Sequence, residues 1–415
     1  MKKIKLTTIL TIILITSFIG CGSLQNKDNN TTSNVDVTLE SEQNNITKED
    51  SEIRNISEDD YYSMDKKDLN YSGIYLDENN NLMTSEDGKS LNKINVTNGA
   101  TEEIITTVNE NFYIREFITN SNYIVWTEGD SKGFGSEYEK VLEWAIYNKN
   151  LATNEVTLIE KSKYNRKDIT LKDYELYEPD SLDISEDNKL VYKGYDFDSS
   201  NNVISKINYY NLEDNAGKEI IKTKELMEEG VFEPKISGEN ISFVKGTDYN
   251  DSSRLIFNNT DLYVYNLEND SLEQVTENIH VTSSNIYNKK LVFSALNDDN
   301  EMVDSLYIYD VNEKSMKNLL YKDSKAVNFL NDINLNDITI GSLDLDDKYV
   351  YIRIQGDYSP LIYNMDSKEF ICVKDEVDSM MKNNLIVVSK KDSRLLRIYV
   401  SGYEIEDTLL DYKLK

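Results

Sequence analysis

The sequence of 415 residues contains a single histidine, two cysteines and three prolines. One histidine cannot supply a catalytic or metal-binding set that needs several, and two cysteines cannot build a disulfide framework or a cysteine-rich zinc site. Basic residues are also few: 45 Lys and Arg stand against 75 Asp and Glu, so the formal net charge is −30. We therefore expect no nucleic-acid partner, because phosphate contacts need a basic surface.

Sequence motifs of catalysis and cofactor binding are missing as well. The chain has no glycine-rich phosphate-binding pattern, no dinucleotide fingerprint and no recognisable nucleophile–base pair. We expect no cofactor, no metal site and no catalytic residue that could be named. The aspartates at 344–347 and 248–251 lack the spacing of a calcium loop. Chemistry by carboxylates alone, as in glycosidic cleavage, needs only two positioned acids and stays open.

The N-terminus has the pattern of an export signal. Three lysines within the first five residues precede an apolar or hydroxylic run over 6–19, and Gly20 and Cys21 follow. This run is shorter than the roughly 20 residues of a comfortable membrane span. The segment resembles the lipobox of bacterial lipoproteins, although Phe18 stands where Leu is commoner. The resemblance implies a signal peptide over 1–20, cleaved before Cys21, and diacylglyceryl and acyl groups such as palmitate on Cys21.

These features predict how the chain is placed in the cell. Residues 21–68 are rich in Asn, Ser, Thr, Asp, Glu and Lys without an apolar period, which predicts a flexible tether. About 47 such residues reach roughly 40 Å. Two or three acyl chains are enough for stable anchoring, so we expect a lipid-anchored protein on the extracytoplasmic side of the cell membrane. An ordinary signal peptide with a chance cysteine is the alternative.

Residues 69–415 have the pattern of an all-β repeat protein. The run LYVYNLEN at 262–269 recurs as LYIYDVNE at 306–313 and more weakly at 361–367. Another β-type run precedes each copy and a short one follows, so each unit of about 50 residues has four strands, as in a β-propeller blade. We predict a propeller, with seven blades as the preferred count, closed by pairing of the run 409–414 with the first blade. A β-sandwich, or six blades with one degenerate unit, is the alternative.

The unit at 233–276 resembles the repeat of TolB-type propellers, to which the propeller domains of prolyl oligopeptidases are related. The Ser-Pro-Asp-Gly turn of that repeat is replaced here by SGEN at 237–240 and SEDN at 185–188. The resemblance implies a fold and no activity. We expect neither the TolB function nor peptidase activity, because the sequence shows neither a TolB-like α/β region before the repeats nor a Gly-x-Ser-x-Gly elbow.

The candidate binding residues lie where the second strand of a unit meets the third. In several units an acidic residue stands beside an aromatic one at this point, although Gly and Asp also occur in loops for purely conformational reasons. Carboxylates can hold basic groups, and aromatic rings can stack on sugars or cover apolar side chains. The candidate ligand-binding residues are Asp196, Phe197, Asp248, Tyr249, Asp357 and Tyr358.

These observations lead to alternatives from different functional classes. The preferred hypothesis is a binding or scaffold module for another envelope component, either a protein or a polysaccharide. The second is a carbohydrate-active enzyme that uses the loop carboxylates on a polysaccharide, and the third is a purely structural partner in an envelope complex. We expect His280, Cys372 and Trp126 to be structural residues.

Overall fold

The computed structural model describes residues 46–415 with several gaps. The gaps are 70–74, 77–80, 85–87, 96–98, 131–142, 163–178, 198–202, 226–227, 250–256, 297–303, 333–338, 355–360, 374–381, 389–394 and 403–406. Cys21 and most of the predicted tether therefore lie outside the described residues.

The described strands form seven sheets that follow one another along the chain. Sheet 1 consists of β4 (Tyr75–Leu76), β5 (Asn81–Thr84), β6 (Ser90–Asn95) and β7 (Thr101–Thr106), and sheet 2 consists of β8 (Tyr113–Thr119), β9 (Tyr123–Gly129), β10 (Trp144–Asn150) and β11 (Val156–Lys161). Sheet 3 consists of β12 (Asp180–Ile184), β13 (Lys189–Phe197), β14 (Val203–Asn211) and β15 (Ala216–Glu225). Sheet 4 consists of β16 (Glu229–Ser237), β17 (Asn240–Tyr249), β18 (Phe257–Asn266) and β19 (Ser271–Gln274).

Sheets 5 to 7 contain the remaining consecutive strands and receive one further strand each from the N-terminal segment. Sheet 5 consists of β20 (Val281–Tyr287), β21 (Lys290–Ala295), β22 (Ser305–Asp310) and β23 (Ser315–Leu320), with β1 (Ile46–Lys48) added. Sheet 6 consists of β24 (Ile340–Leu345), β25 (Tyr349–Ile354), β26 (Leu361–Asn364) and β27 (Glu369–Cys372), with β2 (Glu52–Asn55) added. Sheet 7 consists of β28 (Lys382–Val388), β29 (Leu395–Gly402) and β30 (Asp407–Leu414), with β3 (Tyr61–Leu69) added.

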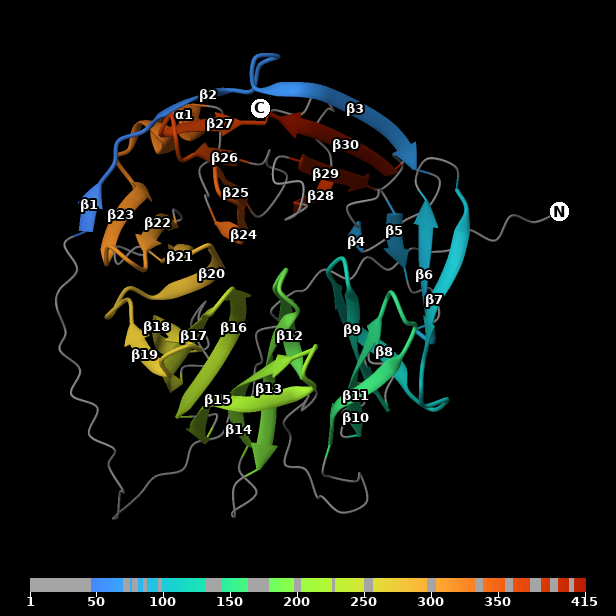
Figure 1. Ribbon diagram of the computed structural model, residues 1–415. Coiled ribbons are helices and arrows are strands. Elements are labelled where there is room, and N and C mark those ends of the chain that lie inside the picture. Colours follow the sequence, from blue (N-terminus) through green and yellow to red (C-terminus); the bar gives the residue numbers. More distant parts are fainter. Residues whose placement is uncertain are drawn as a thin grey trace, which may run out of the picture.

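The sheets are arranged around a common centre, as Figure 1 shows. The first strands of neighbouring sheets touch one another, from β8 through β12, β16 and β20 to β24, so these strands are innermost. Within each sheet consecutive strands are antiparallel neighbours. This is the architecture of a β-propeller, and the predicted all-β propeller fold is confirmed.

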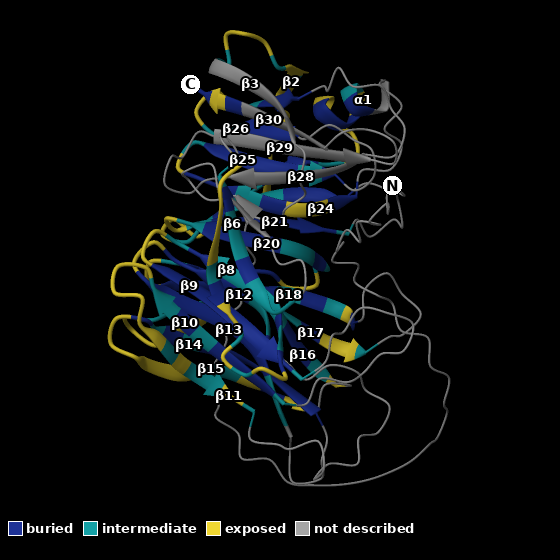
Figure 2. Cartoon of the chain, turned by 90° about the vertical axis from the view of Figure 1, so that its right-hand side faces the viewer, coloured by how far each residue is buried: buried dark blue, intermediate teal, exposed yellow. Residues whose placement is uncertain are grey.

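The core lies between the sheets, which explains the repeated sequence pattern. On β18, Leu262 and Val264 pack toward sheet 5, whereas Tyr263 and Tyr265 pack toward sheet 3. Because side chains alternate along a strand, a strand between two sheets needs apolar or aromatic residues at every position. Trp126 is fully buried in the same way. Figure 2 shows mostly buried strands, with exposed turns along its left-hand edge.

The folded part begins earlier than the predicted boundary at residue 69. Residues 46–69, which we call the belt, run along the outside of sheets 5, 6 and 7 (Figure 1). β1 and β2 add parallel to the outer strands β23 and β27, and β3 adds antiparallel to β30. The tether predicted over 21–68 is thus wrong for this part. The belt attaches mainly through backbone pairing, and only a few apolar side chains, such as Ile53, Ile56 and Tyr61, pack against the core. These are too few to give the polar sequence a recognisable strand pattern.

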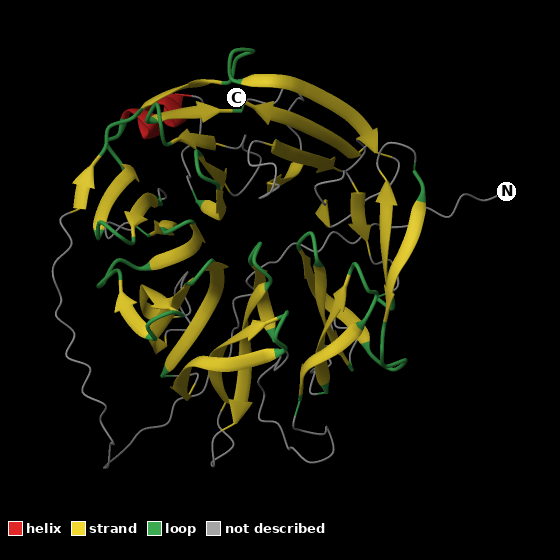
Figure 3. Cartoon of the chain, viewed as in Figure 1, coloured by secondary structure: helices red, strands yellow, loops and turns green. Residues whose placement is uncertain are grey.

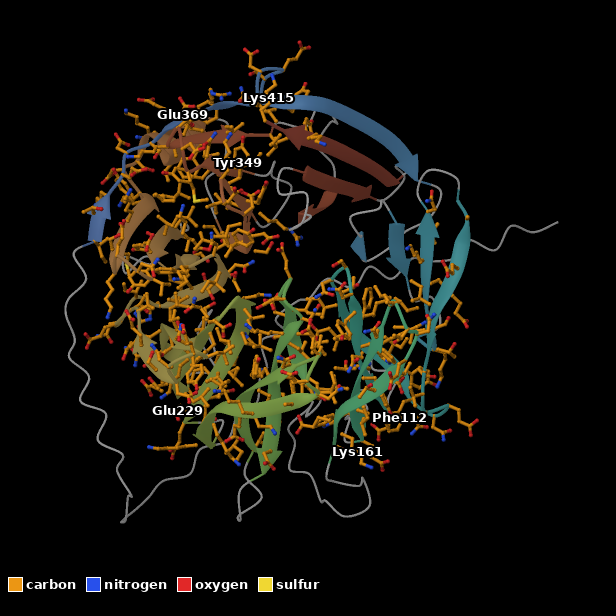
Figure 4. All side chains as sticks on the ribbon, in the orientation of Figure 1. Phe112, Lys161, Glu229, Tyr349, Glu369 and Lys415 are labelled. Carbon is orange, nitrogen blue, oxygen red and sulfur yellow. The ribbon has the colours of Figure 1, made fainter. Side chains whose placement is uncertain are left out.

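Ring closure also differs from the prediction. The run 409–414 belongs to β30, which pairs with β29 and with β3 in sheet 7, not with sheet 1. The N-terminal β3 therefore supplies the outer strand of the last sheet. A backbone carboxylate oxygen of Lys415 accepts hydrogen bonds from Lys348 and Tyr349, and Arg54 of the belt pairs with Glu369 at 3.8 Å. Figure 4 labels Tyr349, Glu369 and Lys415 in this part of the ring.

One described helix, α1 (Lys325–Asp332), lies beside the belt where β2 passes (Figure 3). Its residues Ala326, Val327 and Leu330 are buried in the core between sheets 5 and 6. Across the residues that the structure describes, no helix combines the length and apolar character needed to cross a membrane.

Candidate functional site

The innermost strands share a backbone irregularity. In sheets 2 to 6 the pairing of the first strand with the second slips by one residue, as between Ile114 and Glu116 on β8 or Asp180 and Asp183 on β12. Such bulges leave backbone N–H groups without a partner in the ladder and turn side chains into new directions.

Carboxylates of the preceding sheet accept hydrogen bonds from N–H groups in or beside these bulges. The N–H of Leu182 donates to Glu116 at 3.0 Å, and that of Ile236 donates to Asp183 at 2.7 Å. Asp304, fully buried just before β22, accepts from the N–H of Ile340 at 2.7 Å. These carboxylates therefore hold neighbouring sheets together around the centre.

Glu233 makes the corresponding contact between sheets 4 and 5. It lies in the bulge of β16 with a left-handed backbone (φ 47°) and accepts hydrogen bonds from the Ser284 N–H and the Ser283 hydroxyl. Burial raises the pKa of the Glu233 carboxyl, and the nearby Lys235 and Lys193 only partly offset this effect. A strained residue with a desolvated carboxyl is a candidate for function, but here its contacts explain it as a tie between sheets.

Lys193 forms a closed ionic cluster near the same strands. Its Nζ lies 3.4 Å from Asp180, which also accepts a 3.0 Å hydrogen bond from the Tyr195 hydroxyl. The ammonium lies over the rings of Tyr195 and Phe232, 4.8 and 4.9 Å from their centroids. Burial would lower the pKa of Lys193, but its interactions with Asp180 and Tyr195 together outweigh this effect and the pKa is raised. The cluster satisfies its own charges.

The predicted binding residues of sheet 3 are partly engaged within the protein. Asp196, at the end of β13, lies 3.5 Å from Nζ of Lys222, and its side chain is only 15% exposed. The backbone of Phe197 pairs with Val203 in the same hairpin. This carboxylate therefore already has a cationic partner.

The equivalent residues of sheet 4 differ in exposure. Asp248 is exposed, has a φ of 63° and accepts a 2.8 Å hydrogen bond from Asn258. Tyr249 is half-buried, with its ring edge-on to Phe257 at 5.8 Å between centroids. Asp357 and Tyr358 lie outside the described residues. The structure therefore describes the side chains of Asp196, Asp248 and Tyr249, and the role of the acid–aromatic pairs as a ligand site stays a prediction.

The structure contains a cleft on the opposite face, where the first strand of each sheet turns into the second. It has a volume of about 420 Å³ and lies among the turns of sheets 3, 4 and 5. We call it the turn-face cleft. Buried Ile236 and Ile286 line it together with half-buried Tyr287. Its size falls in the range of about 300–1,000 Å³ that is usual for ligand sites.

Tight hairpins fix the walls of the turn-face cleft. Asn288 and Lys289, the two turn residues between β20 and β21, both have positive φ, as does Gly238 between β16 and β17. Two-residue turns of this kind match the twist of their strands and leave little freedom. The N–H of Asn288 donates to the Ser237 hydroxyl at 3.0 Å and joins the two turns. The cleft is therefore preformed.

Acidic side chains dominate the rim of the turn-face cleft. Nζ of Lys189 lies 2.7 Å from Asp187 and 2.5 Å from Glu239, and so bridges the turns of sheets 3 and 4. Burial would lower the pKa of Lys189, but its hydrogen bonds to Asp187 and Glu239 outweigh it and the pKa is raised. Within the described part of the chain, the carboxylates of Glu186 and Glu268 have no hydrogen-bond or ion-pair partner.

The sequence identified two of these turns, 185–188 and 237–240, only as variants of a structural turn and not as part of a binding site. The available signal was the repeated acidic residue at equivalent positions, Asp187 and Glu239. Their meeting with the turn at 288–289 depends on how the sheets pack, which no sequence pattern states.

The described residues offer no group of three or more His, Cys, Asp or Glu side chains placed to hold a metal ion. Asp346, in one of the aspartate runs, accepts hydrogen bonds from the N–H groups of Lys348 and Tyr349 and from the Tyr351 hydroxyl, each at 2.7 Å. The carboxylate oxygens of Asp346 therefore stabilise the β24–β25 turn through hydrogen bonds. Cys372 is buried, and His280 has a φ of 54° just before β20.

Similarity to known proteins is confined to the fold. No family model and no curated protein matches the sequence. A prolyl endopeptidase structure superposes with a TM-score of 0.53 at 9% identity, over 86% of this chain and 51% of that one. An acylaminoacyl peptidase in complex with Z-Gly-Gly-Phe-chloromethyl ketone gives 0.51 at 11% identity, over 81% and 49%. The propeller domain of the Trilobed protease from Pyrococcus furiosus gives 0.49 at 15% identity, over 80% and 90%.

This chain spans about half the length of the first two of these peptidases. At such low identities the likeness extends to the architecture and not to activity. The TolB-type repeat and the lipobox stay predictions. The chain is a β-propeller protein.

Proposed function

We propose that this protein is a membrane-anchored extracytoplasmic lipoprotein whose propeller binds another component of the cell envelope. The observation that carries the proposal is the turn-face cleft, which is preformed, has the size of a ligand site and carries carboxylates without partners in the described part of the chain. The lipid on Cys21 would hold the propeller at the membrane, where an envelope partner is available.

We favour binding over polysaccharide cleavage because the described loop side chains already contact other residues of the protein. Cleavage would need two carboxylates with room for a sugar between them, and open aromatic platforms. Asp196 is paired with Lys222, and the Tyr249 ring packs on Phe257. The described loop face thus supplies side chains that are engaged with one another.

Cross-linking in intact cells, followed by affinity isolation of the full-length chain, tests the binding role. Glu268→Trp fills the turn-face cleft from an exposed rim position, and Glu219→Trp on exposed β15 is the matched control. We expect one envelope component to be isolated with the wild type and the control, and to be lost with Glu268→Trp. Equal recovery with both variants would remove the cleft from the function.

Anchoring is tested separately with Cys21→Ala in the full-length chain. We expect this variant to leave the membrane fraction, because the lipid has no attachment site. A variant that stays in the membrane fraction after a high-salt wash would contradict the lipid anchor.

A further inference from the structure

We infer that the turn-face cleft receives the lysine or arginine side chain of an extended, positively charged segment of a partner protein. This inference rests on the proposed binding function and names the chemistry of the partner. It concerns the cleft itself, not the acid–aromatic loop residues of the other face.

The protein already places one ammonium group at this rim. Lys189 reaches between Asp187 and Glu239 and approaches the carbonyl of Gly238 at 3.4 Å. An ammonium held by two carboxylates and a backbone carbonyl is a charge-assisted arrangement that a partner cation can repeat. These three acceptors are occupied by Lys189, so a ligand would use the neighbouring Glu186 and Glu268 instead.

The remaining charges of the cleft also call for a cation. Glu186 and Glu268 carry the carboxylates without partners in the described chain, and Lys289 contributes one ammonium that has no described partner either. Asp187, Glu239 and Lys189 together carry one further negative charge. The cleft is thus net negative by about two charges, and an incoming guanidinium or ammonium would offset part of this charge.

The shape of the cleft suits a long basic side chain. Ile236, Ile286 and Tyr287 line the same space as the acidic residues. Ile236 and Ile286 are only 1% exposed, so the half-buried Tyr287 offers most of the apolar surface. The methylene groups of lysine or arginine can cover this surface while the charged head stays at the carboxylates of the rim. A small inorganic cation would leave the apolar lining unused.

The net charge of the whole chain acts in the same direction. A protein with a formal charge of −30 attracts positively charged partners over distance and repels acidic ones, which raises the association rate at low salt. A basic protein segment is therefore favoured over an acidic envelope polymer, and the latter becomes an outcome of the test.

The probe is a fluorescently labelled nonapeptide with arginine at every third position and glycine or serine elsewhere. Its binding to the full-length chain in detergent is measured by fluorescence anisotropy, against the same peptide with citrulline in place of arginine. We expect the citrulline peptide to bind at least tenfold more weakly. Raising the salt from 50 to 300 mM should weaken the arginine peptide several-fold, because exposed charges are screened.

Two variants of the cleft and one control variant test whether the peptide binds in the cleft. Glu186→Gln with Glu268→Gln should weaken the arginine peptide about tenfold, whereas Glu102→Gln with Glu219→Gln, on exposed β7 and β15, should leave it unchanged. Lys289→Asn should tighten binding several-fold, because it removes the competing ammonium and asparagine tolerates the left-handed backbone at this position. Thermal unfolding of each variant checks that the fold is intact.

Equal binding of the arginine and citrulline peptides, or equal loss with the cleft and control variants, would overturn the inference. So would tighter binding of a polyanionic wall polymer than of the arginine peptide. If cross-linking still isolates an envelope component that Glu268→Trp abolishes, the proposed function stands and only the chemistry of the partner is wrong. If Glu268→Trp has no effect in cells, the binding function itself fails at this site.

Discussion

Asp183 on β12 accepts a 2.7 Å hydrogen bond from the backbone N–H of Ile236 on β16, the first strand of the next sheet. Glu116, Glu233 and Asp304 make the same kind of contact from sheets 2, 4 and 5. Each carboxylate satisfies an N–H group in or beside a bulge, where the ladder offers no partner. The bulges of the innermost strands and the carboxylates that bind to them therefore form a repeated contact that fixes the packing of neighbouring sheets.

Removing the Asp183 carboxylate should destabilise the propeller measurably. Asp183→Ala leaves the Ile236 N–H buried without an acceptor, and we expect a loss of about 1–3 kcal/mol in the free energy of unfolding. Asp183→Asn keeps one oxygen as an acceptor and should cost less. Urea denaturation followed by tryptophan fluorescence measures both. Equal losses for the two variants would mean that the hydrogen bond to Ile236 contributes nothing.

Glu233 should make stability depend on pH. Burial raises its pKa in the folded state above the ordinary value near 4.5. Between these two pKa values the folded chain binds more protons than the unfolded one, so stability falls as pH rises through this window. Glu233→Gln removes the effect and keeps the hydrogen-bonding shape.

The measurement for Glu233 is the difference in unfolding free energy between Glu233→Gln and the wild type, taken in urea at several pH values from 4.5 to 8. We expect this difference to shift in favour of the glutamine variant as pH rises and to level off above the folded pKa. Taking the difference cancels the other carboxylates of this acidic chain. A difference that is constant with pH, or that shifts toward the wild type, would contradict the raised pKa.

The propeller was predictable because its strands are packed on both faces. Leu262 to Tyr265 alternate between two sheets, so the whole run is apolar or aromatic, and similar runs recur in other units. The belt left no such signal, since Thr47 and Lys48 pair through the backbone and their side chains are exposed. The turn-face cleft was hidden for another reason: Asp187 and Glu239 are 52 positions apart, and only the packing of sheets 3 and 4 brings both to Lys189.

Gly246 on β17 should tolerate no side chain. A Cβ at this position would lie 2.6 Å from the ring of Phe257, which is itself buried. Gly246→Ala should therefore displace the ring and cost about 1–3 kcal/mol. The matched control is Gly99→Asn, because a Cβ there meets nothing within 4 Å and asparagine tolerates the φ of 70°.

Thermal unfolding distinguishes the two glycine variants, and a rescue experiment identifies the clash. In Gly246→Ala combined with Phe257→Leu, the smaller side chain should accommodate the new methyl group, so the two changes together should cost less than the sum of the single changes. Strict additivity would show that the ring of Phe257 is not what the alanine meets.

The strands of the belt should differ sharply in how much they contribute to the stability of the propeller. β1 and β2 extend sheets that already have four strands, and their side chains are mostly exposed. The ion pairs of this segment, such as Lys325 with Asp50 and Glu52, lie at the surface, where each contributes about 0–1 kcal/mol. Deleting 46–55 from the full chain should therefore lower the melting temperature by only a few degrees.

β3 supplies the fourth strand of sheet 7 and joins the N-terminal segment to β30. Without it β30 becomes an open edge and the ring loses its closure. Deleting 46–69 should therefore broaden the thermal transition, expose β30 to proteolysis and promote association through the free edge. Calorimetry, limited proteolysis and light scattering of the two deletion variants measure these effects. Similar behaviour of both deletions would show that β3 is no more important for closure than the two parallel strands before it.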